Sequence, residues 1–267
     1  MGRSSIEAMF TETKAEGRAA FLPFMTAGLP NPEESPSLFK AMADAGADAF
    51  EVGIPYTDPL MDGPVIQQGS DTAIRAGATL DVSINILASV ARETAKPTIA
   101  MTYVNPIFRR GVDRFCEELA EAGADALIVP DLPVDESHSP RIAAERHGLG
   151  VVLIVAPTSD AKRIEAVAAA DPVFIYAVAE MGVTGERTDS GSHVVEIAER
   201  VRAVTGAPIV FGVGISTPEQ AAAAGKVADG VIVGSALVRR AIEAESAESA
   251  RDSLATAVSE IAQALRS

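Results

Sequence analysis

The chain has 267 residues, 48% of them hydrophobic, which is enough for one sizeable core. Its 22 Lys and Arg residues stand against 37 Asp and Glu residues, and the net charge of −15 makes nucleic acid and anionic membranes unfavourable partners. The single cysteine, Cys116, excludes an internal disulfide and a cysteine metal cage, and its helical context favours a packed thiol over a nucleophile.

The start of the chain, Met1-Gly2-Arg3-Ser4-Ser5, lacks the apolar block of a signal peptide. No run of about 18 apolar residues indicates a membrane span. We therefore expect a cytoplasmic protein.

Short apolar runs alternate along the chain with longer amphipathic segments. Eight runs are apolar on both faces, as buried parallel strands are. The predicted strands span residues 21–26, 49–53, 98–103, 126–130, 151–155, 173–178, 209–212 and 230–234. The predicted helices between them span residues 34–45, 112–122, 137–147, 161–169, 194–204, 218–224 and 236–243.

Three stretches depart from this alternation. Residues 4–17 predict an extra helix before the first strand. Residues 57–95 are too long for one connection and predict a loop followed by two helices, at about 65–76 and 81–95. Residues 180–192 are polar and Gly-rich and predict a mobile loop after the sixth strand.

Eight β/α units in a chain of this length predict an α/β fold. We expect a single (β/α)8 TIM barrel with an extra N-terminal helix and an extra helix after strand 2. An open doubly wound sheet is the alternative fold. No Ser/Gly linker or low-complexity tract divides the chain, so one domain covering residues 1–267 is expected.

In such a barrel, catalytic groups lie at the carboxyl ends of the strands and in the loops that follow. The polar residues that this rule selects are Glu51, Asp58, Asp62, Tyr103, Asp131 and Tyr176. None of the five lysines falls at a predicted strand exit, which disfavours a Schiff-base aldolase. The three histidines are scattered, which disfavours a metal-dependent aldolase. Carboxylates and tyrosines are therefore left to carry proton transfers.

Glycine turns follow the last two predicted strands. They read Phe211-Gly212-Val213-Gly214-Ile215-Ser216 and Val233-Gly234-Ser235-Ala236. Barrels often bind phosphate at this place with backbone N–H groups and a helix N-terminus. The pattern favours a phosphate site, with simple tight-turn packing as the alternative.

One long segment carries a resemblance to a known family. Residues 50–67 read Phe-Glu-Val-Gly-Ile-Pro-Tyr-Thr-Asp-Pro-Leu-Met-Asp-Gly-Pro-Val-Ile-Gln and resemble the tryptophan synthase alpha family. Matches extend over most of the chain, at residues 21–28, 101–106, 130–133, 182–185, 212–215 and 234–235. The resemblance implies a lyase of aromatic amino-acid biosynthesis that cleaves indole-3-glycerol phosphate into indole and glyceraldehyde 3-phosphate.

The resemblance also implies roles for single residues. Glu51 would be the general acid/base, and Asp62 would hold the indole N–H and stabilise positive charge on the ring. Thr184 would orient Asp62. Substrate contacts would come from the remaining matching positions, Phe24, Ile66, Met101, Tyr103, Tyr176, Gly185, Gly214, Gly234 and Ser235. Structural alternatives are an ion-paired strand carboxylate for Glu51 and a turn residue for Asp62.

This chemistry agrees with the residue inventory, because without lysine or metal the protonated indole ring must be the electron sink. That sink requires one carboxylic acid near the reacting carbons and an ionised carboxylate near the ring nitrogen. The chain departs from the family pattern at Thr57 and Met61, where Ser and Ala are common, and at Ala179-Glu180, where Ser-Arg is common. The carboxylate of Glu180, which most family members lack, is expected to alter closure of the loop or affinity for the phosphate.

The resemblance further implies a partner. Alpha subunits of this family work in an alpha2beta2 heterotetramer, and contact is expected through the loop around Asp58. The chain itself is expected to carry no cofactor and no metal, and pyridoxal phosphate is expected in the beta subunit. Ile54, Pro55 and Leu60 suit a buried contact, or alternatively pack on the barrel rim. A stand-alone lyase and a non-catalytic phosphate-binding barrel are the alternative functions.

Overall fold

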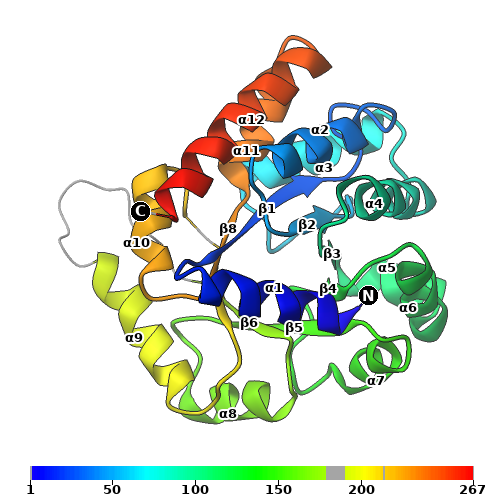
Figure 1. The fold of residues 1–267 in the computed structure, drawn as a ribbon. Coiled ribbons are helices and arrows are strands. Elements are labelled where there is room, and N and C mark those ends of the chain that lie inside the picture. Colours follow the sequence, from blue (N-terminus) through cyan, green and yellow to red (C-terminus); the bar gives the residue numbers. More distant parts are fainter. Residues whose placement is uncertain (1, 179–189, 213, 267) are drawn as a thin grey trace.

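The computed structural model describes residues 2–178, 190–212 and 214–266, with the backbone alone for residues 190–193. Eight parallel strands form a closed barrel in chain order, and β1 pairs with both β2 and β8 (Figure 1). The predicted (β/α)8 barrel is thereby confirmed. The strands are β1 (Ala20–Thr26), β2 (Phe50–Gly53), β3 (Thr98–Met101), β4 (Ala126–Ile128), β5 (Gly150–Val155), β6 (Phe174–Ala177), β7 (Ile209–Phe211) and β8 (Gly230–Val233).

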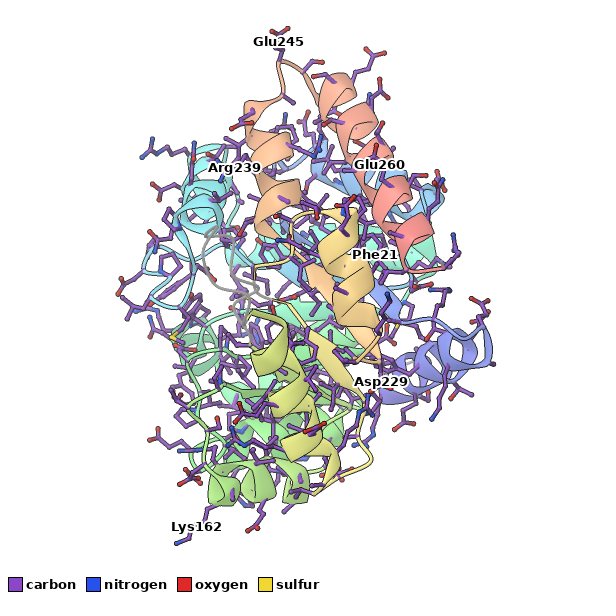
Figure 2. All side chains as sticks on the ribbon, turned by 90° about the vertical axis from the view of Figure 1, so that its left-hand side faces the viewer. Phe21, Lys162, Asp229, Arg239, Glu245 and Glu260 are labelled. Atoms are coloured by element: carbon purple, nitrogen blue, oxygen red, sulfur yellow. The ribbon has the colours of Figure 1, made fainter. Side chains whose placement is uncertain are left out.

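Helices surround the barrel (Figure 1). In the described ranges they are α1 (Arg3–Ala15), α2 (Ser35–Asp44), α3 (Pro64–Arg75), α4 (Leu80–Thr94), α5 (Val104–Arg110), α6 (Val112–Glu121), α7 (His138–Arg146), α8 (Ala161–Ala169), α9 (Ser190–Arg202), α10 (Pro218–Gly225), α11 (Ser235–Glu243) and α12 (Ala247–Ala264). The apolar faces of these helices pack on strands that are buried on both sides, which explains the near-continuous apolar strand sequences. Figure 2 shows charged side chains such as Lys162 and Glu245 at the periphery, whereas Phe21 on β1 is buried.

The predicted N-terminal helix is present as α1 and covers the amino-terminal end of the barrel. Its cap residue Gly2 donates its N–H to Asp125 Oδ1 at 2.6 Å, just before β4. The ring of Phe10 packs edge-on against that of Phe174 at the start of β6, with 5.8 Å between centroids. With this end closed, the opposite end of the barrel is left for ligands.

The long connection after β2 contains the two predicted helices, α3 and α4. Pro64 begins α3, where its missing N–H costs no hydrogen bond. Thr79 caps α4 by accepting the N–H of Val82. The start of α3 at Pro64 fixes where the loop of residues 54–63 ends, and that loop carries Asp58 and Asp62 to the carboxyl end of the barrel.

Two helices were not expected from the sequence. The third strand ends at Met101, not at residue 103, because Tyr103 is already the cap of the seven-residue helix α5. The fourth strand likewise ends at Ile128. After α11, a capping box of Ser246 and Ser249 starts α12, which packs against α2, α10 and α11.

The predicted mobile loop of residues 180–192 lies mostly in the range 179–189, outside the described residues, and α9 begins at Ser190. In the part of the chain that is described, no single helix is long and apolar enough to cross a membrane. The pair α3 and α4, bent by 105°, meets that test only when taken together, by length and composition alone.

Candidate active site

A cavity of about 450 Å³ opens at the carboxyl end of the barrel. Nine of the residues that the sequence singled out line it together: Phe24, Glu51, Asp62, Ile66, Met101, Tyr176, Gly214, Gly234 and Ser235. They come from strand exits and following loops around the barrel, so closure of the sheet is what gathers them. No lysine or arginine lines this cavity among the residues that the structure describes.

Glu51 lies on β2, where every residue of the strand is buried. Its side chain points into the cavity, and its Oε2 atom is buried without a hydrogen-bond partner. Burial, and secondarily the charge of Asp62, raises the pKa of Glu51 to about 8. Among the described residues Glu51 has no ion-pair partner, and a buried carboxyl group without one is unfavourable for folding, so nothing in the described part of the chain supports the alternative of an ion-paired strand carboxylate.

Asp62 lies in the loop between β2 and α3. Its backbone N–H donates to Pro59 O at 3.0 Å, and its carbonyl oxygen accepts from Gln67 Nε2 at 2.8 Å. These bonds fix the backbone and leave the carboxylate facing the cavity. Burial raises the pKa of Asp62 to about 6, while a hydrogen bond from the Tyr103 hydroxyl acts in the opposite direction.

Tyr103 is almost wholly buried and lies behind Asp62; it is not among the described residues that line the cavity. Its hydroxyl oxygen accepts the N–H of Met61 at 3.0 Å, and its ring stacks on Tyr56. Asp131, another strand-exit candidate, also lies outside the wall. Its Oδ1 accepts the N–H of Val104 at 2.9 Å and so caps the start of α5.

Tyr176 on β6 fits tightly against the turn after β7. A Cβ atom added to Gly212 would lie 2.1 Å from Tyr176 Cε2 and 2.2 Å from the Tyr176 hydroxyl oxygen, so only glycine fits there. Burial, followed by the charges of Glu51 and Asp62, raises the pKa of Tyr176 well above its usual value. Tyr176 is therefore a neutral hydroxyl donor in the wall of the cavity.

The residues after β7 and β8 that line the cavity are Gly214, Ser216, Gly234, Ser235 and Ala236. Ser235 begins α11 with Gly234 as its cap, and N–H groups in the first turn of a helix have no partner within the helix. Gly214 has a φ of 79°, which glycine adopts without strain. With hydroxyls, N–H groups and a helix N-terminus, this set of residues suits an anion such as phosphate.

Thr184 and Gly185, expected to contact Asp62 and the phosphate, lie outside the described residues, as does Glu180. Asp58 is exposed on the rim of the barrel, beside Leu60, whose side chain is 78% exposed. The loop that carries Asp62 therefore also presents apolar surface to the outside.

Sequence reasoning missed the apolar strand residues of the wall, Ile128, Ile154 and Ile232. The register of the strands identifies two of them, because Ile128 pairs with Met101 and Ile154 pairs with Tyr176. Residues that share a register layer in a barrel point inward together, so the layer through Met101 and Tyr176 identifies the other members.

Comparison with known proteins gives the family of the chain. The family model described as tryptophan synthase alpha chain matches residues 10–266. A tryptophan synthase alpha chain from Streptomyces avermitilis is 43% identical over 253 residues, covering 95% of this chain and 91% of the relative. One from Picosynechococcus sp. is 45% identical over 246 residues, covering 92% and 93%.

Solved structures give the same result for the fold. Tryptophan synthase from Mycobacterium tuberculosis superposes with a TM-score of 0.87 at 36% identity, covering 98% of each chain. Tryptophan synthase subunit alpha from Legionella pneumophila superposes with a TM-score of 0.87 at 32% identity, covering 99% of this chain and 98% of that one.

Proposed function

The chain belongs to the tryptophan synthase alpha chain family, and we propose that the residues lining its cavity carry out the lyase reaction of that family. The enzyme is a carbon–carbon lyase of tryptophan biosynthesis that cleaves indole-3-glycerol phosphate into indole and glyceraldehyde 3-phosphate. Two carboxyl groups, those of Glu51 and Asp62, perform this cleavage in the present chain.

Glu51 is the general acid and then the general base. With a pKa of about 8 its carboxyl group is mostly protonated at neutral pH, so it can give a proton to the indole carbon that bears the side chain. The carboxylate that remains then takes the proton of the neighbouring hydroxyl. The carbon–carbon bond breaks, its electron pair returns to the ring, and the hydroxyl carbon becomes the aldehyde.

Asp62 is the ionised partner. With a pKa of about 6 it is mostly a carboxylate at neutral pH, so it can accept the indole N–H and stabilise the positive charge that ring protonation creates. The observation that carries the proposal is this pair: two carboxyl groups in one cavity whose surroundings hold one protonated and the other ionised at the same pH.

The rest of the cavity suits the other parts of the substrate. Phe24, Ile66 and Met101 supply an apolar wall for the indole ring. Tyr176 lies beside the position of the glycerol chain, and Gly214, Gly234 and Ser235 hold the phosphate together with the N-terminus of α11. From the family resemblance we assign Thr184 the orientation of Asp62 and Gly185 a contact with the phosphate.

We propose further that the chain acts as one domain, residues 1–267, in the cytoplasm and in complex with a tryptophan synthase beta subunit as an alpha2beta2 assembly. Asp58 and the exposed Leu60 of the same loop face the partner, and Phe108 on α5, 57% exposed, extends the apolar surface. The alpha chain contributes no cofactor, and pyridoxal phosphate resides in the beta subunit.

Indole release from indole-3-glycerol phosphate, measured with and without a tryptophan synthase beta subunit, tests this function. We expect slow release by the chain alone and a strong increase when the beta subunit is added. Fast release that the beta subunit does not change would contradict the partner and indicate a stand-alone lyase. No release from folded protein in either condition would contradict the activity and indicate a non-catalytic barrel.

A further inference from the structure

Tyr103 is tied to the loop that carries Asp62 at two points. Its hydroxyl oxygen accepts the N–H of Met61, the residue directly before Asp62, at 3.0 Å. Its ring stacks on the ring of Tyr56 from the same loop, with 5.3 Å between centroids and 27° between planes. Tyr103 itself is 3% exposed, at the junction of β3 and α5. Tyr103, a buried residue, thus contacts the loop both at Tyr56 and at Met61.

The hydrogen-bonding capacities of these groups fix the direction of the phenol O–H. A backbone N–H can only donate, so the Tyr103 oxygen accepts from Met61 and its own hydrogen stays available. The carboxylate of Asp62, the residue next to Met61, is the acceptor for that hydrogen, and the pKa of Asp62 is lowered when it is bonded. An ionised carboxylate is the better acceptor, and hydrogen bonds to a charged group are stronger than neutral ones. The arrangement therefore favours Asp62 in its ionised state.

The titratable groups on the neighbouring strands do not stabilise the negative charge of Asp62. Glu51 on β2 is a second carboxyl group, and Tyr176 on β6 is a phenol whose pKa the charge of Asp62 raises further. Burial, then the charge of Asp62 and more weakly that of Asp131 after β4, raises the pKa of Tyr103 itself. No cation lines the cavity in the described ranges. Among the described residues, Tyr103 is thus a neutral donor that supports the charge on Asp62.

We propose that Tyr103 is a positioning residue that acts through Asp62, anchoring the loop at Met61 and holding the ionised carboxylate toward the ring nitrogen of the substrate. This inference rests on the proposed function, because it requires Asp62 to act in the cleavage. It gives Tyr103 a role different from the direct substrate contact that the family resemblance implies, and it agrees with the position of Tyr103 behind the cavity wall.

The variant Tyr103→Phe tests the proposal, because it removes the hydroxyl and keeps the ring that stacks on Tyr56. We expect kcat to fall about tenfold with KM little changed, since a hydrogen bond to a charged group contributes roughly that factor. We also expect the acidic midpoint of the pH–rate profile to move to higher pH, because the hydrogen bond from Tyr103 lowers the pKa of Asp62. A profile identical to that of the parent chain would overturn the proposal.

The matched control is Tyr56→Phe, which removes the hydroxyl that accepts from Asn105 Nδ2 and leaves the ring stack and the Tyr103 hydroxyl in place. Its acidic midpoint should stay where it is in the parent chain. A midpoint shift in Tyr56→Phe equal to that in Tyr103→Phe would mean that loop packing, not the Tyr103 hydroxyl, sets the profile, and would overturn the proposal. Melting temperatures of both variants show that the fold is kept.

A second measurement separates this inference from the proposed function. In an Asp62→Ala background, Tyr103→Phe should cause no further loss of indole release, since residues that act as a unit have non-additive effects. A further tenfold loss there would overturn the positioning role. A normal rate in Asp62→Ala itself would defeat the proposed function. An impaired Asp62→Ala together with an unimpaired Tyr103→Phe would defeat only the inference about Tyr103.

Discussion

The carboxyl groups of Glu51 and Asp62 line the same cavity, and after burial the charge of Asp62 is the second cause of the raised pKa of Glu51. An ionised Asp62 makes it harder for Glu51 to lose its proton, so the pKa of Glu51 is raised above that of Asp62. Catalysis that needs a donor and an anion in one site is served by this unequal pair. Both the activity and the stability of the chain should therefore depend on pH through these two groups.

The parent chain should have a bell-shaped pH–rate profile. The profile of kcat/KM should rise with a midpoint near 6, as Asp62 ionises, and fall with a midpoint near 8, as Glu51 loses its proton. Asp62→Asn should lose the acidic limb and keep the alkaline one. The initial rate of indole release from pH 5 to 9 measures both, and an acidic limb that persists in Asp62→Asn would assign it to another group.

Glu51→Gln should stabilise the fold as it removes activity. A carboxyl group whose pKa is raised from 4.5 to about 8 binds a proton in the folded state that the unfolded state releases, so the stability of the parent chain falls as pH rises across that range. The variant lacks this penalty. Its gain in free energy of unfolding should be near zero at pH 4.5 and a few kcal/mol by pH 8.

Urea unfolding of the parent chain and of Glu51→Gln at several pH values measures this gain. Glu7→Gln is the control, because Glu7 is an exposed surface residue that pairs with Arg3. An equal gain in free energy of unfolding at pH 5 and at pH 8 would show that folding does not raise the pKa of Glu51.

Gly212→Ala should impair catalysis by displacing Tyr176. The added Cβ would overlap the Tyr176 ring at 2.1 Å, and overpacking of this kind typically costs about 1–3 kcal/mol. Gly206→Ala is the control, since a Cβ there meets nothing within 4 Å. The rate of indole release and the melting temperature are measured for both variants. Parent-like activity in Gly212→Ala would contradict the tight fit of Tyr176 against Gly212.

The partner surface can be tested at Leu60. Leu60→Asp places a charge on the exposed apolar rim and should weaken binding of the beta subunit about tenfold, the effect of losing roughly 1.4 kcal/mol of contact energy. The basal rate without the beta subunit serves as the reference for folding. Val204→Asp, at another exposed apolar position, should bind the beta subunit normally. Equal binding by Leu60→Asp and the parent chain would move the interface elsewhere.

The barrel could be predicted because its signals are local. Eight strand segments that are apolar on both faces alternate with amphipathic helical segments along the chain. The glycine turns mark the carboxyl ends of the last two strands. The carboxylates Glu51 and Asp62 could be named because the rule on strand exits and the family motif select the same positions. Neither source gives the pKa values, which depend on burial that arises only when the barrel closes.

The helices α5 and α12 escaped prediction for different reasons. Asn105-Pro106 follows a strand directly, so the sequence favours a turn, yet proline is tolerated in the first turn of α5. The segment of α12 is rich in Ala, Ser and Glu, and much of its burial comes from α2, which lies about 200 positions earlier in the chain. The support of Asp62 by Tyr103 was also out of reach, because the anchoring bond joins Met61 to a strand exit 42 positions along the chain.

The roles of Glu51 and Asp62 in the cleavage are tested most directly by the initial rate of indole release from indole-3-glycerol phosphate. The rate is measured at pH 7, with saturating beta subunit, for the parent chain, Glu51→Gln and Asp62→Asn. We predict release by the parent chain and a loss of roughly 10²–10⁴ in each variant, the usual contribution of a positioned acid or base. A parent-like rate in either variant, with the fold retained, would contradict the role of that residue.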